Sequence, residues 1–230
     1  STWSGSATCW HVRIASERNA SANPPAERDN LPIHEDRVHG VHVKGLSEYY
    51  VSGASEVYEI IERGSSTRAV SATRMNTESS RSHSIFVYTI QQRSTETGTI
   101  KSGSLYLVDL AGSEKVGKTG ASGQTLEEAK KINRSLSALG MVINALTDGK
   151  TQHVPYRDSK LTRILQESLG GNSRTTLIVN CSPVAYNAEE TVSTLRFGVR
   201  AKAIKNNAHV NAELSPDELR AQLRLSLIHI

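Results

Sequence analysis

Leu105–Leu146 reads LYLVDLAGSEKVGKTGASGQTLEEAKKINRSLSALGMVINAL, and the rest of the chain is organised around this stretch. An apolar run ends at Asp109, the chain reaches Gly112 shortly afterwards, and Glu114 follows. A short buried strand that delivers an aspartate and then a glycine into a loop is how many nucleotide-hydrolysing enzymes sense a terminal phosphate. The stretch therefore predicts a strand, a phosphate-sensing loop and a helix, in that order.

The second half of the stretch has the spacing of a long amphipathic helix. Apolar residues recur at intervals of three and four, which places them on one helix face: Leu126, Ala129, Ile132, Leu136, Leu139, Ile143 and Leu146. Asp148-Gly149 predicts the end of this helix, because glycine readily takes the left-handed conformation that closes helices.

Gly112–Thr119 also fits the phosphate-loop pattern G-x-x-x-x-G-K-[ST]. In a true phosphate loop the helix starts at once, so that its N-terminus faces the phosphates. Here Gly120-Ala-Ser-Gly123 intervenes, and the helical pattern starts only near Leu126. We therefore favour a reading in which Asp109 holds the water shell of Mg²⁺ and the Gly112 amide approaches a γ-phosphate.

Other strands are predicted by alternation or by continuous apolar runs. They are Val38–Gly45, a hairpin of Ser84–Gln92 with Ile100–Val108, and the apolar run Thr175–Cys181, which is typical of a strand buried on both faces.

Helical patterns alternate with these strands. Helices are predicted at Ser55–Arg63 with Gly64 as the stop, at Leu161–Leu169 before Gly170, at Ala188–Ile204, and from Ser215 onwards. Strands that alternate with helices indicate a three-layer α/β domain.

The composition indicates a globular chain with a mildly basic surface. Of 230 residues, 37% are hydrophobic, and 27 Lys and Arg face 23 Asp and Glu, which suits an acidic partner surface. Only 5% are aromatic, which argues against a partner made of single-stranded nucleic acid. Two cysteines without metal-ligand spacing suit the reducing cytoplasm, and no apolar run is long enough to insert into a membrane.

A second polar cluster, NTESSRSH at 76–83, lies just before the first hairpin strand. Together with LVDLAGSE and HVPYRDSKLTRIL, this cluster resembles the motifs of the kinesin motor family. GASGQTLEEAKKIN, SLSALGMVINAL and IKNNAHVNAEL resemble the conventional (kinesin-1 type) branch of that family in fungi. The resemblance runs from about residue 30 to about residue 224.

The resemblance implies a P-loop NTPase-like fold that binds ATP and Mg²⁺. Ser80 would reach the metal ion directly, and Asp109 would hold it through water. Asn76, Ser79 and the Gly112 amide would surround the γ-phosphate and the attacking water.

The resemblance further implies that Arg81 and Glu114 form an ion pair that closes the site. Glu114 would take the proton of the attacking water through a second water molecule. His83 is expected to be a hydrogen-bonding residue rather than a metal ligand.

A microtubule-based motor is the activity that the resemblance implies. The residues implied to contact the microtubule are Lys115, Asn133, Tyr156, Arg157, Lys160 and Arg163. Arg157, Lys160 and Arg163 are spaced three residues apart, which would place them on one helix face. The same spacing also fits an ordinary solvated surface. Because tubulin is acidic, these contacts should be sensitive to salt.

Residues 204–214 resemble the neck linker of the family, which can be free in one state and add to a sheet as an edge strand in another. Ile204 begins this segment, and Val210 and Asn211 would anchor its docked form. Residues 215–224 would begin a neck helix, which implies a homodimer through a downstream coiled coil, with light chains or cargo adaptors as further partners. Movement towards the plus end follows only from the resemblance.

Both ends are expected to lie outside the native motor. Residues 1–29 lack apolar periodicity and are expected to be disordered or non-native, since codons can be chosen for STWSGSATCWH whose shifted frame resembles the family's upstream sequence. Residues 225–230, LSLIHI, match one frame of a transposase sequencing adapter. The motor part, 30–203, would then lack the phosphate loop and its central strand, so we expect the chain alone neither to hydrolyse ATP nor to fold stably.

Two other functions stay open at this point. One is a microtubule-binding module without ATPase activity, which a parent gene lacking an upstream phosphate loop would favour. The other is a P-loop kinase that uses Gly112–Thr119, which a helix starting at Lys118 would favour.

Overall fold

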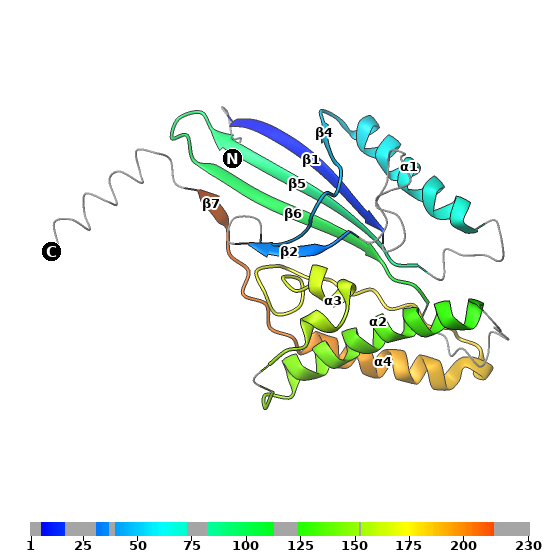
Figure 1. Cartoon of the computed structure of the whole chain (residues 1–230). Helices are drawn as coiled ribbons and strands as arrows, with labels where there is room; N and C mark the ends of the chain where they lie inside the picture. The colour runs from blue at the N-terminus through cyan, green and yellow to red at the C-terminus, as the bar shows by residue number, and fades with distance from the viewer. Residues whose placement is uncertain are drawn as a thin grey trace.

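The computed structural model describes residues 6–16, 31–36, 40–72, 82–112, 124–151 and 153–213. A five-stranded sheet crosses the centre of this part of the chain, in the order β4-β1-β5-β6-β7 (Figure 1). Every neighbouring pair of strands in it is antiparallel. The bounds are β1 Ser6–Ser16, β4 Glu48–Val51, β5 Ser84–Ser94, β6 Ile100–Asp109 and β7 Asn211–Glu213.

Four α-helices and two short 3-10 turns accompany the strands in the described residues. They are α1 Ala54–Ala72, α2 Gln124–Thr147, α3 Lys160–Ile164 and α4 Ala188–Lys202, with η3 Tyr156–Asp158 and η4 Ala185–Asn187. None of the helices in these ranges has the length and apolar character needed to cross a bilayer.

β5 sets the layers of the fold, because successive side chains of a strand point to opposite faces of the sheet. Ile85 and Val87 pack into a core shared with α2 and α3. Phe86 and Tyr88 pack on the other face, beside Ile60 of α1. Helices therefore lie on both faces of the sheet, as Figure 1 shows, and the predicted three-layer α/β arrangement is confirmed.

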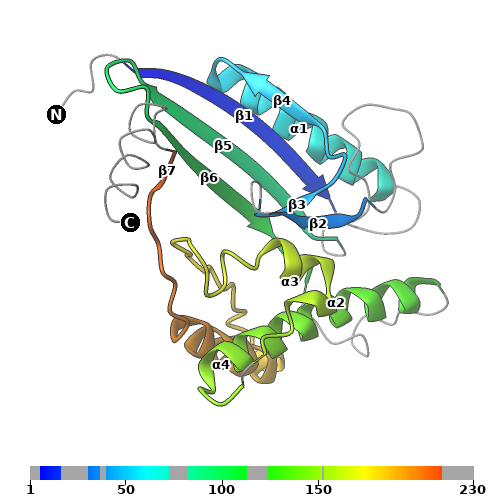
Figure 2. The same cartoon turned by 60° about the vertical axis from the view of Figure 1, so that its left-hand side comes forward.

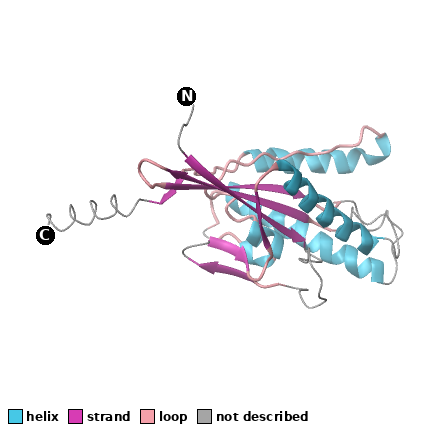
Figure 3. Ribbon diagram, turned by 90° about the horizontal axis from the view of Figure 1, so that it is seen from above, coloured by secondary structure: helices cyan, strands magenta, loops and turns pink. Residues whose placement is uncertain are grey.

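A separate two-stranded sheet, β2 Ile33–Asp36 with β3 Gly40–Val43, lies beside α3 (Figure 2). Seen from above, the strands of the larger sheet fan out with a twist, and this small sheet stands apart from them (Figure 3). The alternation at Val38–Gly45 predicted β3 but not its partner strand.

The hairpin and the long helix are confirmed with small shifts of their ends. β5 and β6 pair along almost their whole length, from Ser84 opposite Asp109 to Arg93 opposite Ile100. The long helix is α2, and it ends next to Gly149, whose φ of 64° is the left-handed conformation that the sequence predicted there.

Ser6–Ser16 departs from the expected disorder, because it forms β1 between β4 and β5. A strand between two others is held through its backbone N–H and C=O groups, and these are present whatever the side-chain pattern. The missing apolar alternation was therefore a poor guide to structure at this position.

α1 also runs further than predicted, because it continues through Gly64 to Ala72. A glycine in the interior of a helix costs only about 1 kcal/mol. The packing of Val57 and Ile60 beneath the helix, against the sheet, outweighs that cost.

The prediction of a buried strand at Thr175–Cys181 is wrong in this structure. The segment is extended without strand pairing, and its apolar side chains are open to solvent, with Ile178 80% and Leu177 43% exposed. An apolar run becomes a buried strand only when neighbouring strands supply hydrogen bonds and cover, and none of the described strands lies against this one.

Candidate functional site

Asp109 is the last residue of β6, and it is exposed at the point where the chain leaves the sheet. The chain then turns inward, with Ala111 only 4% exposed and Gly112 half-buried. The described residues contain no group of three side chains able to hold a metal ion. A single exposed carboxylate nevertheless fits Mg²⁺, which keeps several of its waters and needs only one or two carboxylates besides phosphate oxygens.

Six of the predicted site residues lie outside the described residues: Asn76, Ser79, Ser80, Arg81, Glu114 and Lys115. The structure does describe the residues that flank them. Ser84, which follows the first polar cluster, is paired in register with Asp109, which precedes the second. The hairpin therefore brings the flanks of the two predicted clusters side by side.

His83 connects these flanks to α2. Its Nδ1 accepts a hydrogen bond from the backbone N–H of Ala111 at 2.9 Å, and its Nε2 lies 2.7 Å from Oγ of Ser135 in α2. The imidazole is only 1% exposed. The expectation that His83 is a hydrogen-bonding residue is confirmed, and its partners place it between the sheet and the helix.

The predicted cationic helix face is built differently from the expectation. Arg157 belongs to η3, whereas Lys160 and Arg163 belong to α3, because the chain is extended at Ser159 (φ −146°, ψ 155°). Ser159 accepts a hydrogen bond from the backbone N–H of Thr162 at 3.0 Å and so caps the start of α3. The prediction of one continuous helix face is therefore wrong.

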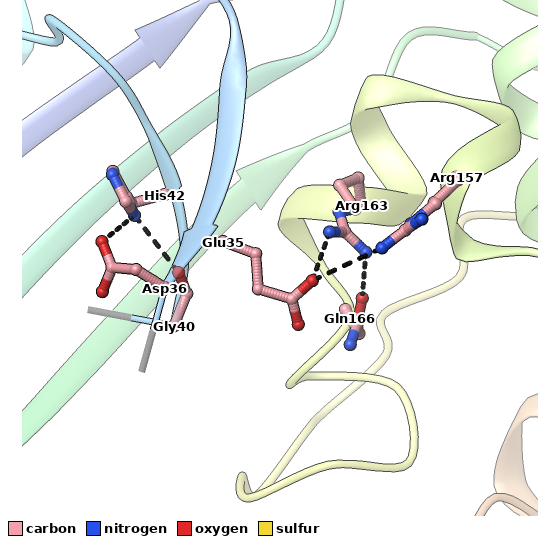
Figure 4. A network of polar contacts seen from close by, with 7 residues as sticks. All are labelled: Glu35, Asp36, Gly40, His42, Arg157, Arg163 and Gln166. Atoms are coloured by element: carbon pink, nitrogen blue, oxygen red, sulfur yellow. Dashed lines mark hydrogen bonds and ion pairs between the residues drawn. The ribbon is translucent and has the colours of Figure 1, made fainter. Parts of the chain in front are cut away.

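Glu35 of β2 brings the two arginines together in spite of this break (Figure 4). Its Oε2 lies 2.5 Å from Nη2 of Arg163 and 3.8 Å from Nη2 of Arg157. Arg163 also donates from Nη1 to Gln166 Oε1 at 3.1 Å. Sequence reasoning missed Glu35, since its partner Arg163 is 128 residues away along the chain.

The other predicted contact residues differ in how far they reach solvent. Lys160 donates to the backbone oxygen of Leu31 at 3.0 Å, which ties α3 to the chain just before β2. The hydroxyl of Tyr156 donates inward to the backbone oxygen of Leu169. Burial and the negative charge of Glu167 raise the pKa of the Tyr156 phenol. Asn133 is half-buried on α2.

One apolar core lies under both ends of this arrangement. It contains Ile85 and Val87 of β5, Leu139 and Ile143 of α2, and Leu161 of α3. The strand that follows the first polar cluster and the short helix that carries the cationic residues are thus both packed on α2.

Residues 204–213 run from this core to the edge of the sheet. Ile204 packs against the core, and β7 pairs with the start of β6, with Asn211 opposite Ser102. Asn211 also accepts a hydrogen bond from the side chain of Asn172 at 2.7 Å. Val210, which was expected to help anchor the segment, is 71% exposed, so most of its side chain is open to solvent.

Comparison with known proteins gives one family over most of the chain. Residues 17–204 match the family model of the kinesin motor domain, so the match begins upstream of the boundary expected at residue 30 and leaves out β1. A kinesin heavy chain of Botryotinia fuckeliana is 76% identical over 214 residues, which are 93% of this chain and 24% of that protein. A kinesin heavy chain of Doryteuthis pealeii is 60% identical over 191 residues, 83% of this chain and 20% of that protein.

Solved structures agree with these relatives. A structure of a fast kinesin is similar with a TM-score of 0.83 and 69% identity, covering 94% of this chain and 61% of that one. A KIF14 dimer with AMP-PNP in complex with a microtubule is similar with a TM-score of 0.80 and 40% identity, covering 90% and 62%. The chain spans about a quarter of the length of the fungal heavy chains it matches.

Proposed function

Because the chain belongs to the kinesin motor family, we propose that it is the C-terminal part of an ATP-driven, microtubule-based motor domain of the conventional type. The substrate is ATP with Mg²⁺, the motor moves along microtubules, and it acts in the cytoplasm. The experiments below use the parent protein, defined as the longest product of the gene that contains this chain.

The observation that carries this proposal is the shared core beneath the two candidate surfaces. Ile85 of β5 lies two residues after His83, and Leu161 of α3 lies next to Lys160, yet both belong to the same buried cluster as Ile143 of α2. A closely packed core transmits small displacements because it has no free space to absorb them. A nucleotide-dependent movement at one end can therefore change the cationic surface at the other.

The nucleotide end would act by positioning, since phosphoryl transfer needs orientation and charge stabilisation more than a strong base. Asp109 and Ser80 would hold Mg²⁺, which neutralises charge on the phosphate oxygens when it is bound. The Gly112 amide, with Asn76 and Ser79, would orient the γ-phosphate and the water that attacks it.

Glu114, paired with Arg81, would receive the proton of that water through a second water molecule. Glu114→Ala in the parent protein should leave ATP binding intact and abolish microtubule-stimulated hydrolysis. Stimulated turnover equal to that of the wild type would exclude this role for Glu114.

The cationic surface of Arg157, Lys160 and Arg163, together with Lys115, Tyr156 and Asn133, would contact the acidic microtubule. The test is co-sedimentation of the parent protein with microtubules. Arg157→Ala should weaken binding and reduce its dependence on salt, because Arg157 is 77% exposed and available to a partner. Arg93→Ala removes an exposed arginine at the far end of the β5–β6 hairpin and serves as the matched control. An equal effect of both substitutions would contradict the assignment.

The proposal includes a missing upstream segment with the phosphate loop and its strand. The outer edge of β6 supports this, because among the described strands only β7 pairs with that edge, at Ile100–Ser102. The apolar side chains of Leu105 and Leu107 further along β6 are also 52% and 51% exposed. Unpaired apolar edges favour association and instability. The isolated chain should therefore bind ATP weakly and unfold readily, whereas the parent protein should do neither. Tight ATP binding by the isolated chain in a titration would refute this part.

A microtubule-binding module without ATPase activity is the second candidate. A parent protein that co-sediments with microtubules but never hydrolyses ATP would establish it. Dimerisation through a downstream coiled coil, light chains or cargo adaptors, and movement towards the plus end belong to the proposal for the parent protein. Kinesin membership gives no support to the P-loop kinase alternative.

A further inference from the structure

His83 and Ser135 are buried polar residues that meet between the sheet and α2. They are 1% and 5% exposed, respectively. Buried polar groups are costly unless they are hydrogen-bonded, and both nitrogens of this imidazole have a partner. The arrangement therefore uses the full hydrogen-bonding capacity of one side chain in a site that water does not reach.

The partners fix the tautomer of the imidazole. The backbone N–H of Ala111 can only donate, so Nδ1 must accept and carries no proton. In the neutral ring the proton then lies on Nε2, which donates to Oγ of Ser135. A second proton on Nδ1 would leave two donors facing each other in a dry site.

The imidazole connects three segments that have separate roles in the proposed function. His83 closes the first polar cluster, Ala111 directly precedes Gly112, and Ser135 lies on α2 shortly before the fully buried Ala138 and Val142. A shift of the Gly112 loop must therefore either move the imidazole or break its bond to Ala111.

We infer that His83 is a positioning residue that couples the Gly112 loop to α2 through its link to Ser135. It does not touch the nucleotide. It makes the position of α2 depend on whether the Ala111 amide stays in place. The inference rests on the proposed function, because the coupling matters for a cycle in which a nucleotide displaces that loop.

Ser135→Ala in the parent protein is the sharpest test, because it removes the link to α2 and keeps the imidazole to which the Ala111 amide donates. Ser137→Ala, at an exposed position of the same helix, is the matched control. Ser135→Ala should leave ATP affinity and basal turnover unchanged and lower the microtubule-stimulated kcat by about two- to tenfold, as expected for one buried hydrogen bond. Ser137→Ala should change neither.

His83→Asn gives an independent check, since its amide oxygen takes the place of Nδ1 but the side chain is too short to reach Ser135. It should lower the stimulated kcat as Ser135→Ala does, and the double variant should be no worse than either one. Additive losses, or equal falls in basal and stimulated turnover, would show that His83 serves stability alone and would overturn the inference.

Two further measurements do not depend on ATPase activity. The ¹⁵N NMR signals of His83 should show an unprotonated Nδ1 and a protonated Nε2. Amide exchange at Ala111 should be faster by about two- to tenfold in Ser135→Ala than in Ser137→Ala. If the parent protein has no stimulated ATPase, the proposed function fails, and these readouts still decide the coupling. The opposite tautomer, or unchanged exchange at Ala111, would refute it.

Discussion

Glu35 contacts two arginines unequally, and this inequality predicts a measurable difference in their coupling energies. Its Oε2 is 2.5 Å from Arg163, whose side chain is 15% exposed, and 3.8 Å from Arg157, whose side chain is 77% exposed. Exposed ion pairs contribute about 0.2–1 kcal/mol, and hydrogen bonds to charged groups about 1.5–3 kcal/mol. Because Glu35 is itself 43% exposed, solvent screening reduces the Arg163 pair to about 1 kcal/mol and leaves the Arg157 pair below about 0.3 kcal/mol.

Double-mutant cycles measure these two couplings directly. Glu35→Gln is combined with Arg163→Gln in one cycle and with Arg157→Gln in the other, and the free energy of unfolding of the parent protein is measured in urea. The Arg163 coupling should be about 1 kcal/mol at low salt and should decrease as salt is added, because the pair is partly open to solvent. Equal couplings in both cycles, or a larger one for Arg157, would show that β2 is not held against α3 by the contact in Figure 4.

Three other changes test the packing. Gly170→Ala should destabilise the parent protein by about 1–3 kcal/mol in urea unfolding, since Gly170 has φ 93° and an added Cβ would lie 2.9 Å from a methyl carbon of Leu146; an unchanged midpoint would contradict this. Ile143→Ala should lower the free energy of unfolding by about 2–5 kcal/mol and Val199→Ala by less than about 0.5 kcal/mol, because Ile143 is 2% and Val199 72% exposed. Thermal unfolding measures both, and a larger loss for Val199→Ala would contradict the prediction. Folding raises the pKa of Tyr156, so the contribution of Tyr156 to stability should be complete below pH 10, the ordinary pKa of tyrosine, and should decline above it. Tyr156→Phe should remove this part of the decline when the free energy of unfolding is measured against pH.

The periodic parts of the chain could be predicted from the sequence because their patterns directly record which side chains are buried. The pattern of Ser84–Gln92 predicted β5, whose Ile85 and Val87 enter the core, and the spacing of α2 placed Leu139 and Ile143 on its apolar stripe. Asp109 and Gly112 could be placed at the end of a strand for the same reason. These predictions depend only on residues that are close together in the sequence, within one helix or strand.

The predictions that failed depended on groups far away in the sequence. The apolar run at Thr175–Cys181 looked like a buried strand, but strand formation depends on neighbouring strands, and none of the described strands accompanies it. The cationic residues looked like one helix face, but the cap at Ser159 divides them and Glu35, from a distant strand, brings the arginines together. No local pattern records such a partner.

The contacts along residues 204–213 also determine how a pulling force on the C-terminal end would be borne. β7 has only three residue pairs with β6, so it should separate first. Each of its exposed hydrogen bonds contributes only about 0.5–1.5 kcal/mol. The contacts of Asn172 with His209 and Asn211 come next, and Asn206 follows through its bond from the Gly170 amide. Only then does tension reach Ile204 in the core. The segment is therefore graded in mechanical strength, weakest at its outer end, so a moderate load would detach it without disturbing the body of the domain.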